Sequence, residues 1–148
     1  MRTFSPSKRP TSNELWRSAG FPASRGPELI LRLRQGLPVS VIETIHSWAG
    51  FPKADILRIT GINAKTLSRR KAGSGTLSPD ESEKIARLIR VADAAVALFE
   101  GDREKAVNWM RKPVRGLANE TPESLLNTES GAVEVLDLIG RLEHGVFS

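Results

Sequence analysis

Cysteine is absent from the 148-residue chain, so neither a disulfide framework nor a thiolate metal site can form. Tyrosine is also missing, and His46 and His144 are the two imidazoles, with no acidic cluster at metal-ligand spacing around them. Gly73-Ser-Gly75 lacks the downstream Lys-Ser/Thr pair of a phosphate-cradling loop. These absences argue against a metal, a cofactor and catalysis, so we expect a protein that is not an enzyme.

Long apolar runs are missing as well. No stretch approaches the roughly 18 apolar residues needed to cross a bilayer, and the basic start of the chain is not followed by the apolar run of a signal peptide. We therefore expect a cytoplasmic protein with no membrane partner. Its 39% hydrophobic and 26% charged residues are ordinary for a folded chain, and its length suits one domain or two very small ones sharing a core.

Charge is divided unevenly along the chain. Residues 1–76 carry 13 Lys and Arg against 4 Asp and Glu, a balance of +9, whereas the remainder carries 9 against 13, a balance of −4. Such asymmetry indicates that the first half meets a polyanion and the second half a different partner. A basic half can also be merely well solvated, so charge alone leaves nucleic-acid binding open.

The spacing of apolar residues predicts an all-α fold. Strand signals are lacking, because no segment alternates apolar and polar residues. Residues 1–26 are rich in Pro, Ser, Arg and Gly without a sustained period, which predicts a flexible basic arm. Helical spacing begins at Pro27, and a flexible hinge at residues 73–76 separates a helix-turn-helix region, 27–76, from a second helical region, 77–148.

Residues 53–71 have the pattern of a helix-turn-helix. Ile56 and Leu57 give a short first helix an apolar face, and Gly61 supplies the left-handed conformation of a sharp turn. Ile62 would fill the corner. Asn63 is a good N-cap for a second helix, because its side chain can accept a hydrogen bond from the amides of the first turn.

The second helix of this motif offers short and basic side chains, which suit a recognition helix in the major groove. We expect Lys65, Ser68 and Arg69 to contact bases. Phosphate contacts suit the remaining basic residues, and the full predicted DNA-binding set is Arg58, Asn63, Lys65, Ser68, Arg69, Arg70 and Lys71. The alternative is an ordinary helix pair with a solvated basic face, but turn glycine, cap, basic face and regional charge coincide.

The second region opens with Ser78 as N-cap, Pro79 at the first helical position and acids in the first turn. A long helix should run to Glu100, and it carries an apolar stripe of Ile85, Leu88, Ile89, Ala92, Val96 and Phe99. That stripe is either core or a dimer seam. Asp102 should cap a further helix ending before Pro113, and a last amphipathic helix should end at Gly145.

The C-terminal region resembles a known family. Trp109, Pro113, Leu117, the box Thr121-Pro122-Glu123-Ser124-Leu125-Leu126, Thr128, Gly131 and the helix ending at Gly145 are similar in order and spacing to the toxin-binding domain of Xre/MbcA/ParS antitoxins. The preceding helix-turn-helix is similar to their Xre-like part, so the likeness covers residues 36–148. It implies an antitoxin that covers the active site of a RES-domain, NAD-consuming toxin, represses its own operon and forms a homodimer.

The irregular segment after Pro113 and its flanks are where we place the toxin-binding residues, because short exposed loops commonly carry function. The predicted set is Trp109, Arg111, Lys112, Arg115, Leu117, Asn119, Glu120, Asn127, Thr128 and Glu129. Trp109 and Leu117 can equally belong to the core. The rival interpretation is a one-component helix-turn-helix transcription factor whose C-terminal half senses a small ligand.

Overall fold

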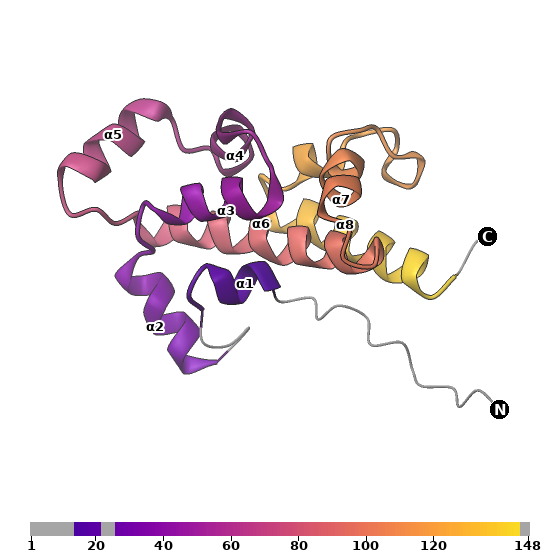
Figure 1. The fold of residues 1–148 in the computed structure, drawn as a ribbon, viewed down its shortest axis with the longest axis horizontal. Coiled ribbons are helices and arrows are strands. Elements are labelled where there is room, and N and C mark those ends of the chain that lie inside the picture. The colour runs from indigo at the N-terminus through magenta and orange to yellow at the C-terminus, as the bar shows by residue number, and fades with distance from the viewer. Residues whose placement is uncertain (1–13, 22–25, 146–148) are drawn as a thin grey trace.

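Helices form nearly all of the regular structure in this computed structural model, which describes residues 14–21 and 26–145. Figure 1 shows their arrangement, and within these residues no strand is present. The all-α prediction is therefore confirmed. The elements are α1 (Glu14–Ser18), α2 (Pro27–Gln35), α3 (Val41–Ala49), α4 (Lys53–Thr60), α5 (Ala64–Ala72), α6 (Pro79–Leu98), α7 (Arg103–Met110), the 3₁₀ turns η1 (Arg115–Leu117) and η2 (Pro122–Leu125), and α8 (Glu129–Glu143).

The twenty-residue helix α6 is the central rod of the molecule (Figure 1). Its start follows the predicted pattern, because Ser78 and Glu81 form a reciprocal capping box ahead of Pro79. Helices α1, α2, α4, α7 and α8 all pack on it, and α3 joins them through α1, α4 and α7. The rod therefore carries side chains from both sequence regions.

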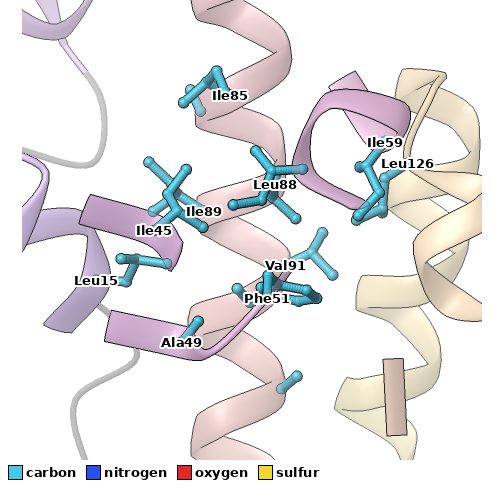
Figure 2. Close-up of a cluster of buried hydrophobic side chains, with 14 of the residues drawn as sticks. Leu15, Ile45, Ala49, Phe51, Ile59, Ile85, Leu88, Ile89, Val91 and Leu126 are labelled. Carbon is cyan, nitrogen blue, oxygen red and sulfur yellow. The ribbon is translucent and has the colours of Figure 1, made fainter. Parts of the chain in front are cut away.

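The apolar stripe of α6 lies in the core of the chain itself. Figure 2 shows Leu15 and Ile45 on one flank of this helix, and Ile59 and Leu126 together on the other. The stripe residues are buried except for Phe99, which is half-buried. Since its side chains are already covered within one chain, the stripe does not offer a dimer seam.

Residues 14–21 do not form part of a flexible arm, so that prediction is wrong for this segment. Leu15, Trp16 and Phe21 are buried, and the rings of Trp16 and Phe21 stack with centroids 4.0 Å apart. Burying a large apolar side chain stabilises a fold by roughly 1.5–3 kcal/mol. This gain favours docking of the segment on the core, although the residues around it are basic and rich in glycine. The rest of the predicted arm falls on residues 1–13 and 22–25, outside the described residues, and on Gly26, which precedes α2.

A buried carboxylate on α6 holds this N-terminal helix. Asp93 accepts the backbone N–H of Leu15 at 2.8 Å and that of Trp16 at 3.0 Å, and it is only 2% exposed. These two amides belong to the first turn of α1, where the helix has no partner of its own for them. Burial raises the pKa of the Asp93 carboxyl to about 6, against the lowering effect of the two amides.

The raised pKa predicts a pH dependence of stability. Between pH about 4 and about 6 the folded chain holds the Asp93 proton more tightly than the unfolded chain, so the free energy of unfolding should fall as pH rises through this window. The contribution is at most about 3 kcal/mol, because each pKa unit is worth about 1.4 kcal/mol. Denaturant titrations from pH 4 to 7 should show this slope in the native chain and not in Asp93→Asn; parallel pH profiles would contradict the assignment.

The predicted hinge at residues 73–76 is tied down rather than loose. Thr76 pairs with Pro38 in an isolated antiparallel bridge, the N–H of Val39 donates to Gly75 O at 2.9 Å, and the N–H of Leu77 donates to Leu37 O at 2.8 Å. The chain therefore enters α6 from a position fixed against the start of α3.

Candidate functional site

The turn between α4 and α5 has the geometry that the sequence predicts. Gly61 is left-handed, with φ of 71°, and Ile62 is buried beneath the corner. Asn63 Oδ1 accepts the N–H of Thr66 at 2.7 Å, so the N-cap is confirmed. These contacts are local, and they set the direction in which α5 leaves the body of the protein.

Helix α5 stands away from the rest of the molecule at one end of α6 (Figure 1). None of its residues is buried, although Leu67 is half-buried and packs against the edge of the core. Within the described residues, the side chains of Lys65, Ser68, Arg69 and Lys71 are exposed and make no ion pair. This helix therefore presents unpaired positive charge and a hydroxyl to the surroundings.

Arg70 lies on the side of α5 that faces the start of α6. Its Nε is 3.2 Å from Glu81 Oε1, within the capping box of α6. Burial acts to raise the pKa of Glu81, but hydrogen bonds from Ser78 and Arg70 outweigh it and the pKa is lowered. Glu81 is thus ionised at neutral pH, and a phosphate would have to compete with it for Arg70.

Arg58 occupies an ionic cluster, defined here as Asp55, Arg58, Arg111 and Glu123. Its guanidinium donates from Nη2 to Glu123 Oε1 at 2.8 Å and to Asp55 Oδ1 at 3.0 Å. Hydrogen bonding with Glu123, and then with Asp55, raises the pKa of Arg58. Arg111 Nε lies 3.0 Å from Asp55 Oδ2 as an ion pair without hydrogen-bond geometry.

This ionic cluster joins α4 of the helix-turn-helix to the end of α7 and to η2. Glu123 is 6% exposed, and its Oε2 has no hydrogen-bond partner within the described residues. A carboxylate so buried depends on its cation, because a lone buried charge is costly. The structure thus gives Arg58 a structural partner that the sequence did not reveal, 65 residues away along the chain.

The irregular segment after α7 is a closed loop. The N–H of Val114 donates to Glu120 O and the N–H of Asn119 donates to Val114 O, both at 3.0 Å. Ala118 and Asn119 turn the corner with φ of 55° and 64°. Inside the loop Leu117 is buried, while Arg115, Asn119 and Glu120 are exposed. Their backbone is fixed, which lowers the entropy cost of binding a partner.

Two members of the predicted toxin-binding set belong to the core side of this segment. Leu117 is buried. Trp109 is half-buried, and its ring is tilted against that of Phe99 with the two ring centroids 6.2 Å apart. The exposed members are Arg111, Lys112, Arg115, Asn119, Glu120, Asn127, Thr128 and Glu129. Of these, Thr128 caps α8 through Gly131 N–H, and Glu129 pairs with Arg87 at 3.0 Å.

Helix α5 and the closed loop after α7 lie at opposite ends of α6 (Figure 1). Partners bound at the two places would not compete for the same surface. None of the helices in the described part of the chain has the length and apolar character for a membrane crossing. In the same residues no group of three or more His, Asp or Glu side chains is arranged to hold a metal ion.

This arrangement defines a helix-turn-helix protein with a second, C-terminal binding region, and comparisons with known proteins agree. Residues 28–90 match the Antitoxin Xre-like helix-turn-helix domain, and residues 94–145 match the Antitoxin Xre/MbcA/ParS C-terminal toxin-binding domain. Two relatives named Antitoxin Xre, from Photorhabdus laumondii and Yersinia enterocolitica, are each 54% identical to this chain over 148 residues, covering the full length of both proteins.

The chain therefore belongs to the Xre/MbcA/ParS antitoxin family. It is an antitoxin of the toxin–antitoxin class with a helix-turn-helix domain and a toxin-binding domain. The first matched range ends at residue 90 and the second begins at residue 94, both inside α6, so this central helix contributes to both domains.

Proposed function

We propose that the chain neutralises a RES-domain, NAD-consuming toxin by covering its active site, and that it represses its own operon as a homodimer in the cytoplasm. The main support for the toxin-binding part of this proposal is the match of residues 94–145 to a toxin-binding domain. In that range the closed loop holds Arg115, Asn119 and Glu120 outward on a fixed backbone. Charged side chains on such a loop suit the entrance of a site that accepts a charged nucleotide.

Support for operator binding comes from α5. Its exposed Lys65, Ser68 and Arg69 have no ionic partner within the described residues, so they are free to meet DNA. Arg58 and Arg70 are the weaker members of the predicted set, because each already pairs with a carboxylate of the protein. We therefore assign base contact to the exposed face of α5 and phosphate contact chiefly to Lys71.

The toxin proposal is tested by co-expressing the chain with the product of the gene beside its own. A stable complex, together with rescue of growth and preserved cellular NAD, is the expected result. An antitoxin that leaves the neighbouring protein free and toxic would contradict it. A solitary protein carrying a bound metabolite would instead favour the ligand-sensing regulator.

The DNA proposal predicts that replacing Lys65 and Arg69 by Ala weakens operator binding. The expected loss is about 1–3 kcal/mol for each base contact removed. The effect should be larger on the operator than on scrambled DNA, because hydrogen bonds to base edges carry the sequence information. Binding titrations on the region upstream of the gene would measure it. The toxin complex and the melting temperature should stay unchanged.

A matched control removes two exposed arginines of α2, Arg32 and Arg34, which changes the net charge equally. If that control weakens operator binding as much as the α5 variant does, the contribution is general electrostatics and the base-contact assignment is wrong. Arg58→Ala should behave differently again, and lower the melting temperature, because it leaves the buried Glu123 without its cation.

A further inference from the structure

Two open hollows lie next to each other across α3 and α7. The first has a volume of about 590 Å³ and is lined by Ser18 of α1, by Arg103 of α7, and by Ser40 and the α3 residues Glu43, Thr44, Ser47 and Trp48. The second, of about 310 Å³, lies between the end of α3 and the α7 residues Val107 and Asn108, with Arg111 beyond them. Ser47 and Trp48 line both, so the two hollows form one continuous surface.

Trp48 is held in place where the two hollows meet. The guanidinium carbon of Arg103 lies 4.0 Å from the centre of its ring, and Arg103 Nη1 donates to Trp48 O at 3.3 Å. Trp48 is half-buried and lines both hollows, so part of the residue remains accessible. A tryptophan already fixed by an arginine gives up little freedom when a partner covers it, and these two residue types are enriched where binding energy is concentrated.

The surface crosses the boundary between the two matched domains. Glu104, Val107, Asn108 and Arg111 belong to the range that matches the toxin-binding domain, whereas residues 47–50 belong to the range that matches the helix-turn-helix. Arg111 is itself one of the residues that we assign to toxin binding. The second hollow is therefore continuous with the toxin-binding surface and extends it onto α3.

We propose that the toxin contacts this antitoxin on both domains, with a segment of the toxin lying across α7 and into the hollows beside Trp48. The inference rests on the proposed function, namely that the chain binds a toxin. The accessible part of Trp48 fits an apolar or aromatic side chain of the toxin, while Val107 lines the second hollow with only 7% of its surface exposed. Glu104 and Arg111 flank them with charges of opposite sign. The helix-turn-helix half is thus a specificity surface for the toxin as well as the DNA-binding half.

The test places a bulky charged side chain in the hollows, using Ser47→Arg on α3 and Asn108→Arg on α7. Both residues are exposed, so the fold should be retained, as circular dichroism and melting temperature would show. Binding to the co-expressed product of the neighbouring gene, measured by titration with the purified full-length chain, should weaken at least tenfold in each variant. Gln35→Arg on α2 is the matched control, since it adds the same charge at an exposed site outside the hollows.

The outcomes separate this inference from the proposal beneath it. Weakened binding in Ser47→Arg and Asn108→Arg, with native affinity in Gln35→Arg, supports a footprint on both domains. Native affinity in folded Ser47→Arg overturns the extension onto α3, while the proposed toxin binding stands. If the native chain fails to bind the toxin, the proposed function itself is overturned and this inference with it.

Discussion

Gly131→Ala should destabilise the protein by about 3 kcal/mol or more, because the added methyl group would overlap backbone atoms, which can move away only if a whole segment shifts. Gly131 lies in the first turn of α8, where its N–H donates to the Thr128 hydroxyl. A methyl group there would stand 1.8 Å from Leu125 O and 2.8 Å from Leu125 C. The start of α8 would have to move away from η2, which carries the buried Glu123. Denaturant unfolding followed by circular dichroism would measure the destabilisation.

Gly140→Ala is the matched control in the same helix. A methyl group at Gly140 meets nothing within 4 Å, so the only expected effect is the gain in helix propensity. That gain should stabilise the protein by about 0.5–1 kcal/mol. Two glycines of one helix should thus respond in opposite directions to the same substitution. Equal stability of Gly131→Ala and the native chain would refute the close packing of α8 on η2.

Reversing Arg115→Glu and Glu120→Arg together should release the toxin while leaving the fold intact. Both side chains are exposed on the closed loop, and the exchange keeps the net charge at +5. If these charges are buried against the toxin, leaving them mispaired costs about 2–5 kcal/mol of binding energy. Isolated surface substitutions otherwise shift stability by less than about 0.5 kcal/mol, so the melting temperature should hardly change.

A parallel exchange on α2, Glu28→Arg with Arg34→Glu, controls for the reversal itself, because both residues are exposed and lie outside the toxin-binding range. Toxin affinity and growth rescue are the two measurements. Full neutralisation by the folded Arg115 and Glu120 variant would show that the loop is a connector and not a toxin-facing surface.

Features that depend on neighbouring residues could be predicted from the sequence. The caps Asn63, Ser78 and Asp102 each bond to an amide three residues along, and Gly61 turns the chain locally. Such interactions follow from residue type and spacing alone. They gave the helix-turn-helix and the helix starts correctly, and the long helix ends at Leu98, close to the predicted Glu100.

Interactions between distant segments could not be predicted in this way. Arg58 and Glu123 are 65 residues apart along the chain. Asp93, which caps α1, is 78 residues from Leu15 and 77 residues from Trp16. One signal was present, because Asp93 follows Ile89 by one helical turn and interrupts an apolar face. Leu15, Trp16 and Phe21 were a second signal, since large apolar side chains are rarely left in water by a chain that can bury them.

The exposure of α5 has a consequence for how this protein can change over time. Apart from Leu67, which packs against the edge of the core, and Arg70, which pairs with Glu81, the residues of α5 are free of the packing constraints that hold the other helices, so substitutions among them alter stability little. If α5 reads the operator as proposed, descendants of one ancestral chain can acquire new operator preferences in α5 while the core is inherited unchanged. The closed loop after α7 and the neighbouring η2 lack that freedom, because the exposed residues proposed to contact the toxin are interleaved there with the buried Leu117 and Glu123. Under the proposed function, a change of toxin would require coordinated substitutions there, whereas a change of operator would not.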